Sequence, residues 1–179
     1  IYGENSGTNS FVISNNNIYN FTNYGIWLYN SAAGSTISGN NIFNTTTQSV
    51  DQYGINIGGG DNITISNNFI GGQLAGCLGS AWLKTAGKFY GIYASLGTTT
   101  ASNIINNKIA NINQSGGTSL WGINTYAGKI NVGSAGNGNT ISDIVNAGTS
   151  STYGISSNSA SVVSIDYNTV ANINASGTG

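Results

Sequence analysis

The chain of 179 residues has the length of one ordinary domain, and it carries only four lysines and five acidic residues, for a formal net charge of −1. No basic stripe fits a phosphate backbone, no apolar run approaches the roughly 20 residues of a membrane span, and one cysteine cannot form an internal disulfide. The many isoleucines and aromatic residues exclude a disordered chain. We therefore expect a folded domain with neither a nucleic-acid partner nor a membrane span.

An aromatic residue followed by glycine, usually with isoleucine next, recurs along the whole chain. Successive copies lie 22 to 37 residues apart and begin at Tyr2, Tyr24, Tyr53, Tyr90, Trp121 and Tyr153. Apolar residues then alternate over three to five positions, as in residues 26–28, which is the periodicity of a short strand. The regularity of the aromatic column predicts that its rings stack at a corner and have an architectural role.

A second motif of the form Ile-x-x-Asn-x-Ile follows the first. Its copies begin at Ile13, Ile37, Ile65, Ile104 and Ile165, and a compressed copy near Ile141 fits poorly. The asparagines three places after the first isoleucine are Asn16, Asn40, Asn68, Asn107 and Asn168. Stacked amides can form a hydrogen-bonded ladder, and asparagine tolerates the left-handed backbone of a sharp corner. We expect these asparagines to form a structural ladder.

A unit of 22 residues holds about three short strands with tight corners, so the chain returns to the same column after three strands. This predicts parallel pairing between successive coils. The Asn-rich pieces could instead be hairpin turns, but hairpins would not return the same isoleucine to the same place in every unit. The predicted fold is therefore all-β, a single-stranded right-handed parallel β-helix of about six coils, with one domain over residues 1–179.

The longest unit contains an inserted loop, residues 71–89, which holds several apolar residues and two lysines: Leu74, Cys77, Leu78, Trp82, Leu83, Lys84 and Lys88. A loop of this size and composition is expected to fold back against the solenoid wall, as a short helix, or to mark a contact site. Cys77 is expected to be a small buried residue rather than a nucleophile, because no histidine is present to activate it.

Positions three and five places after the aromatic residue are expected to point outwards. They form a candidate glycan-contact strip of Trp27, Tyr29, Asn56, Tyr93, Asn124 and Tyr126. Aromatic faces and amides suit a sugar ring, which has an apolar face and a polar edge. The alternative is that Trp27 and Tyr29 lie under a neighbouring loop.

The acidic residues give no sign of an active site. Glycoside cleavage needs two carboxyl groups that face each other, and no two of these share a column on adjacent coils: Glu4, Asp51, Asp61, Asp143 and Asp166. No arginine is present to bind an acidic sugar, no histidine to transfer protons, and no acidic cluster to hold a hard cation. We expect no catalytic residues, no metal and no cofactor.

These motifs resemble the right-handed parallel β-helix repeat family, which has a pectate-lyase-like fold. Gly-Ile-x-Leu followed by Ile-Ser-x-Asn-x-Ile matches its generic repeat, and Tyr-Gly-Ile in a Ser/Thr/Asn-rich background is similar to repeat regions of secreted bacterial surface proteins. The resemblance implies an extracellular or cell-surface location. Some members cleave or epimerise polysaccharides and others are adhesins or fibre shafts, so the fold alone does not choose between these functions.

The expected function is a non-catalytic, extracellular structural or adhesive segment. Neither end resembles a polar capping unit, so we expect a piece of a longer array that pairs with further coils or with another copy of itself. The alternative is a carbohydrate-binding or polysaccharide-degrading module whose catalytic residues lie outside this segment. Polysaccharide is accordingly a second candidate partner.

Overall fold

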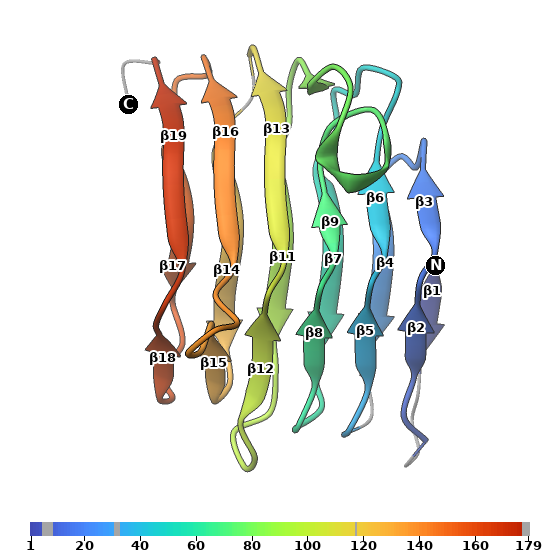
Figure 1. The fold of residues 1–179 in the computed structure, drawn as a ribbon, viewed down its shortest axis with the longest axis vertical. Coiled ribbons are helices and arrows are strands. Elements are labelled where there is room, and N and C mark those ends of the chain that lie inside the picture. Colours follow the sequence, from blue (N-terminus) through green and yellow to red (C-terminus); the bar gives the residue numbers. More distant parts are fainter. Residues whose placement is uncertain (5–8, 31–32, 117, 177–179) are drawn as a thin grey trace.

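The computed structural model describes residues 1–4, 9–30, 33–116 and 118–176. Its regular structure is almost entirely short parallel strands, wound into a stack of coils that Figure 1 shows from the side. Each coil contributes one strand to each of three sheets, and strands of successive coils are neighbours in every sheet. The coils wind in the right-handed sense. The predicted right-handed parallel β-helix is therefore confirmed.

Sheet A contains β1 (Tyr2–Glu4), β4 (Tyr24–Tyr29), β7 (Gln52–Gly58), β11 (Phe89–Ser95), β14 (Leu120–Ala127) and β17 (Thr152–Ser157). Sheet B contains β2 (Val12–Ser14), β5 (Thr36–Ser38), β8 (Thr64–Ser66), β12 (Ser102–Ile105), β15 (Ile130–Val132) and β18 (Val163–Ile165). Sheet C contains β3 (Asn17–Tyr19), β6 (Asn41–Phe43), β9 (Phe69–Ile70), β13 (Lys108–Gln114), β16 (Thr140–Asn146) and β19 (Thr169–Ala175), and β10 (Trp82–Lys84) also pairs with β13.

Columns of aligned isoleucines fill the interior between the three sheets. In sheet A, for example, Ile55 pairs in register with Ile92, and Ile92 with Ile123; all three are fully buried. Sheet C supplies a second column that includes Ile70, Ile109 and Ile141. Burying one such side chain contributes about 1.5–3 kcal/mol, so each central coil is stabilised mainly by the coils on its two sides.

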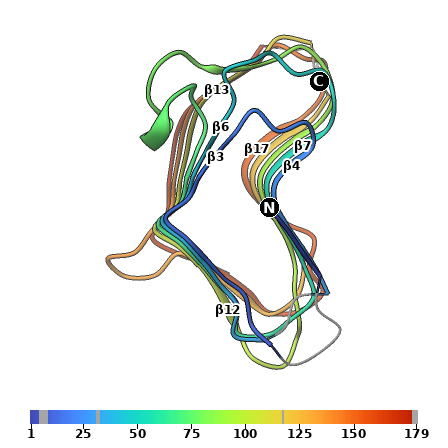
Figure 2. The same cartoon turned by 90° about the vertical axis from the view of Figure 1, so that its right-hand side faces the viewer.

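The glycine of the Tyr-Gly-Ile motif marks the place where sheet A comes closest to sheet C. Figure 2, which looks along the stack, shows the wall of β4, β7 and β17 bending towards the interior. A Cβ atom on Gly54 would lie 2.6 Å from the carbonyl oxygen of Gly91 and 2.7 Å from Cγ2 of Ile70. The motif therefore needs glycine for space, and the aromatic ring before it is left on the outer face.

The first coil departs from the predicted repeat. Tyr2 pairs with Trp27 and Gly3 with Leu28, so Tyr2 is not the first member of the aromatic column. The terminal ammonium of Ile1 donates to the carbonyl of Gly25 at 2.7 Å, which fixes this register. The Tyr2-Gly3 pair therefore resembles the motif only as a dipeptide, and the spacing of 22 residues is not a coil length.

The fifth coil contains the compressed copy near Ile141, and its register was misassigned. Ile141 pairs with Ile109 in sheet C, so it ends the second motif instead of beginning it. The motif begins with Val132, which pairs with Ile104 in sheet B. Between β15 and β16 the chain makes an excursion, the orange loop that stands away from the wall in Figure 2. This loop separates the two halves of the motif in the sequence.

The predicted insertion at residues 71–89 is shorter than expected. Ile70 pairs with Ile109 and Trp82 with Ile112, so β9 and β10 together follow the single strand β13. Residues 71–81, here named the insertion, therefore stand where β13 has only two residues. The expected short helix is a single turn, η1 (Ala75–Cys77). Residues 82–89 belong to the wall or lead back to it, and Trp82 is fully buried in the core.

We expect that residues 71–81 can be replaced by Ala-Asn, the two residues found at this place in β13, with the solenoid intact. Cys77 is the one well-buried side chain of the insertion, since Leu74 and Leu78 are 58% and 61% exposed, and a shorter connection costs less closure entropy. The free energy of unfolding should change by less than about 2 kcal/mol in urea denaturation. The control Trp82→Ala should lower the free energy of unfolding by about 3–5 kcal/mol. Loss of cooperative unfolding in the deletion variant would show that residues 71–81 are part of the solenoid wall and not an insertion.

Candidate functional site

The outer face of sheet A carries a continuous row of stacked rings, here named the aromatic row: Tyr24, Tyr53, Tyr90, Trp121 and Tyr153. Successive ring centroids are 5.1, 4.7, 4.4 and 6.0 Å apart, with planes inclined by 21°, 6°, 2° and 17°. Each stacked pair contributes about 0.5–1.5 kcal/mol beyond the area it buries. The predicted stacking is confirmed, but the rings lie within the strands of sheet A and not at a corner. Tyr2 lies outside the row and packs on Trp27 at 4.9 Å.

The residues of the predicted strip lie beside the aromatic row, and the rings of Trp27 and Tyr93 pack against it. Trp27, Asn56, Tyr93 and Asn124 are aligned in register across four strands. Trp27 stacks on Tyr24 at 4.6 Å, and Tyr93 stands edge-on to Tyr90 at 5.4 Å. The structure therefore brings most of the strip together as the second layer of an aromatic surface.

The residues of the strip differ in their solvent exposure. Tyr29 and Tyr126 are 47% and 55% exposed, whereas Trp27 is half-buried by rings, those of Tyr24 and Tyr2. Asn124 corrects the expectation that the whole strip is exposed, because it is only 5% exposed. Its short side chain is aligned with the larger Tyr93, whose ring stacks on that of Tyr126.

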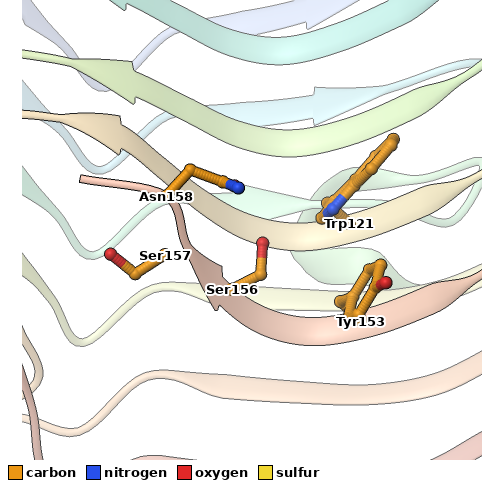
Figure 3. Close-up of a pocket in the computed structure, with 5 residues that line it drawn as sticks. All are labelled: Trp121, Tyr153, Ser156, Ser157 and Asn158. Carbon is orange, nitrogen blue, oxygen red and sulfur yellow. The ribbon is translucent and has the colours of Figure 1, made fainter. Parts of the chain in front are cut away.

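A pocket of about 270 Å³ opens on this face beside the last two rings of the aromatic row. Figure 3 shows Trp121 and Tyr153 on one side, Asn158 and Ser157 on the other, and Ser156 between them. The Oγ atom of Ser156 is buried and has no hydrogen-bond partner, and the same holds for Oδ1 of Asn124 on the adjacent strand. The repeat pattern predicted an architectural role for Trp121 and Tyr153 and gave no sign of the pocket.

The predicted asparagine ladder is present inside the wall and gains one member. Each side-chain amide donates to Oδ1 of the asparagine in the next coil, at 2.8 to 2.9 Å, through the series Asn16, Asn40, Asn68, Asn107, Asn139 and Asn168. The backbone N–H of each asparagine donates to the same oxygen, as Asn68 does to Asn107 at 3.0 Å. Asn139 was missed because the excursion after β15 separates it from the start of its motif.

The left-handed corners lie one residue before the ladder, not on the ladder itself. Positive φ angles occur at Asn15 (58°), Gly39 (67°), Asn67 (57°), Asn106 (55°) and Tyr167 (59°). Asparagine and glycine adopt this conformation at low cost. The two neighbouring positions therefore have separate roles, since the residue at the first turns the chain and the asparagine at the second bonds to the next coil.

All five carboxylates accept hydrogen bonds from neighbouring groups. Asp61 accepts from the backbone N–H of Thr99 and Thr100 at 2.8 and 3.1 Å, and Asp51 from that of Lys88 at 2.8 Å. Hydrogen bonds from the side chains of Asn172 and Ser142 lower the pKa of Asp143. Asp166 accepts from Ser164 and Glu4 from Tyr2. Asp51, Asp61 and Asp166 lie between strands, at corners or loops of the solenoid, whereas Glu4 ends β1 and Asp143 lies within β16.

Lys84 is a lysine inside the wall, 1% exposed, at the end of β10. Its ammonium donates to the carbonyl oxygen of Val50 at 2.6 Å. Burial lowers its pKa to about 8, and the negative charge of Asp51 opposes this shift. Beside it, the indole of Trp82 donates to Gln52 at 3.0 Å. These two hydrogen bonds join β10 to Val50 and Gln52, where the chain enters β7.

The buried Lys84 predicts that stability rises with pH. Between pH 8 and about 10.4 the unfolded chain binds more protons at this lysine than the folded chain does, so Lys84 alone should increase the free energy of unfolding by about 2 kcal/mol from pH 7 to 9.5. The Cys77 thiol, whose pKa burial raises to about 11, opposes this by about 1 kcal/mol because it ionises first in the unfolded chain. Lys84→Met should therefore turn the net rise into a small fall in urea titrations, and the exposed Lys129→Met should keep the rise. Measurements should stop there, because the pKa of Tyr53, raised to about 12, reverses the trend as unfolded tyrosines ionise.

Other chemistry is sparse in the part of the chain that the structure describes. No three side chains of the His, Cys, Asp or Glu type gather there as a metal site would require. Burial raises the pKa of the Cys77 thiol to about 11. None of the described helices has the length and apolar character needed to cross a bilayer.

The outer face of sheet A, with its aromatic row and pocket, is thus the strongest candidate site. Comparisons with protein-family models, with curated proteins and with solved structures find no match to this chain.

Proposed function

We propose that the chain is a non-catalytic segment of an extracellular β-solenoid, serving as a shaft or adhesin at a bacterial cell surface. The proposal follows its resemblance to pectate-lyase-like β-helix repeats and to repeat regions of secreted surface proteins. A durable stack needs few ionic groups, and this chain has four lysines and five acidic residues in all. Its recurring side chains form the core, the aromatic row and the asparagine ladder.

The observation that carries the proposal is the open core of the last coil. Ile165 is 45% exposed and Val170 is 49% exposed, although they pair with Val132 and Ile141, which are fully buried one coil earlier. Ile173 is likewise only partly buried, whereas its partner Ile144 is fully buried. Repeat arrays cover such surfaces with a polar cap or with another repeat. A further coil, from the same chain or from a second copy, fits this surface.

Sedimentation velocity over a concentration series tests the proposal with the chain of 179 residues. We expect concentration-dependent association through the open end. A variant with both Ile165→Lys and Val170→Lys should remain monomeric, and Val162→Lys should still associate, since Val162 is 74% exposed between β17 and β18. A monomer at the highest soluble concentration, or equal association of all three proteins, would overturn it.

Carbohydrate binding is the second candidate function, and the aromatic surface of sheet A favours it. Stacked rings with amides and hydroxyl groups beside them suit the apolar faces and polar edges of sugars. Under this second proposal the chain is a carbohydrate-binding module, or part of a polysaccharide-degrading enzyme whose catalytic residues lie outside this segment. A glycan array tests it: binding to a defined polysaccharide supports it, and no binding to any glycan counts against it.

A further inference from the structure

We propose that the pocket beside Trp121 and Tyr153 binds a single neutral pyranose ring of a glycan. This inference rests on the carbohydrate-binding candidate and assigns it a location and a ligand class. Its basis is a comparison between coils of the same molecule, because the position that carries a tyrosine ring in coil four carries only Ser156, a residue that lines the pocket, in coil six.

Coil four shows what the surface accommodates next to the aromatic row. There Tyr93 stands edge-on to Tyr90 at 5.4 Å and to Tyr53 at 6.0 Å. The equivalent positions in the next two coils are Asn124 and Ser156, which have no ring to place there. The flanks of Trp121 and Tyr153 consequently face the pocket of about 270 Å³. A ring-shaped ligand in this pocket would take the place that Tyr93 occupies in coil four.

The polar atoms at this place favour a sugar over a purely aromatic ligand. Oγ of Ser156, which is one of the residues that line the pocket, is buried and has no hydrogen-bond partner, at a cost of about 1–3 kcal/mol. A serine hydroxyl can both donate and accept hydrogen bonds. Sugar hydroxyl groups can supply both complements. Ser157 and Asn158 line the opposite side of the pocket and offer further polar contacts to the ring edge.

Charge and size define the ligand further. The lining residues Trp121, Tyr153, Ser156, Ser157 and Asn158 are all uncharged. A uronate would bring its carboxylate to a site with no cation and beside an amide oxygen, so neutral sugars should bind better. Pockets for drug-sized ligands measure about 300–1,000 Å³. At about 270 Å³ this pocket suits one ring of a longer glycan.

The three tryptophans provide a built-in readout for an NMR titration of the labelled protein. Trp121 lines the pocket, Trp27 lies at the other end of the aromatic surface, and the buried Trp82 donates to Gln52 and serves as a reference. The probes are the methyl glycosides of glucose, galactose, mannose and N-acetylglucosamine, with glucuronate and galacturonate as charged comparators. We expect at least one neutral glycoside to shift the Trp121 indole signal and to leave Trp82 unchanged.

A filling variant tests the location. Ser156→Tyr gives coil six the ring that coil four has at this position, and it should weaken binding by about tenfold or more while the protein stays folded. The matched control is Asn56→Tyr, which adds a ring to the same column in coil three. This control should leave binding at Trp121 unchanged.

The outcomes separate the pocket from the broader glycan function. Shifts of the Trp27 signal that persist in Ser156→Tyr would show that the glycan binds elsewhere than in the pocket. They would contradict the proposed location and still support carbohydrate binding. Equal or tighter binding of the uronates would overturn the neutral ligand class. No shift of any indole with any probe, together with a negative glycan array, would overturn both proposals.

Discussion

Replacing Gly54 with alanine is expected to destabilise the solenoid by about 3 kcal/mol, a large effect for the addition of one methyl group. The new Cβ would lie 2.6 Å from the backbone oxygen of Gly91 and 2.7 Å from Cγ2 of Ile70. Neither neighbour can move alone, because the first is main chain in the next coil and the second is packed in the core. Urea denaturation followed by circular dichroism measures the change.

Gly58 provides the matched control at the other end of the same strand. A Cβ atom at this position would have its nearest neighbour, the carbonyl oxygen of Leu28, at 3.8 Å, an ordinary contact. Gly58→Ala should leave stability unchanged or raise it slightly, since alanine restricts the unfolded chain. Equal effects of the two substitutions would show that space between sheets A and C is not the reason for the motif.

Replacing Asn107 with leucine is expected to cost about 3–5 kcal/mol, because it interrupts the ladder at a buried position. The backbone N–H and side-chain amide of Asn68 would both lose the oxygen to which they donate at 3.0 and 2.9 Å. The carbonyl of Ile65 would lose its donor at 2.9 Å. Each buried polar group left without a partner costs about 1–3 kcal/mol, and leucine recovers part of this through its apolar contacts.

The control for the ladder is an amide pair on the outer face of sheet B. Asn131 donates to Oδ1 of Asn103 at 3.0 Å, in a partly exposed setting. Asn131→Ala should cost less than about 1 kcal/mol, because water replaces the lost partner. If thermal and urea unfolding show equal losses for the two variants, the ladder has no special role in holding the coils together.

The sequence was sufficient for the architecture because two motifs repeat once per coil. The asparagine ladder could be predicted from residue identity, since amides that bond to one another along the axis need the same residue in each coil. Asn139 escaped because it lies seven places after Val132, whereas the other ladder asparagines lie three places after the first residue of their motif. A search for the second half of the motif would have found it, as Asn139-Thr140-Ile141 matches Asn107-Lys108-Ile109.

One of the remaining errors was visible in the sequence, and the others depended on packing in three dimensions. The misplaced Tyr2-Gly3 copy lacked the following isoleucine, with Glu4 in its place. The reason for glycine in the motif depends on how near sheets A and C approach, and the pocket depends on where neighbouring side chains fail to fill a column. The sequence did show that the residue at this position changes from Tyr93 to Asn124 and Ser156. That the change leaves space for a pocket could be seen only once the stacked rings beside it were placed.

The ladder also gives the solenoid a direction. Every side-chain amide from Asn16 to Asn139 donates towards the following coil, so the amide dipoles point the same way and add along the axis. A unit stacked on the column can continue these bonds only in the same orientation, because the opposite orientation would set oxygen against oxygen or N–H against N–H. Such head-to-tail contacts do not close on themselves. An assembly built this way would be a polar filament with two chemically different ends.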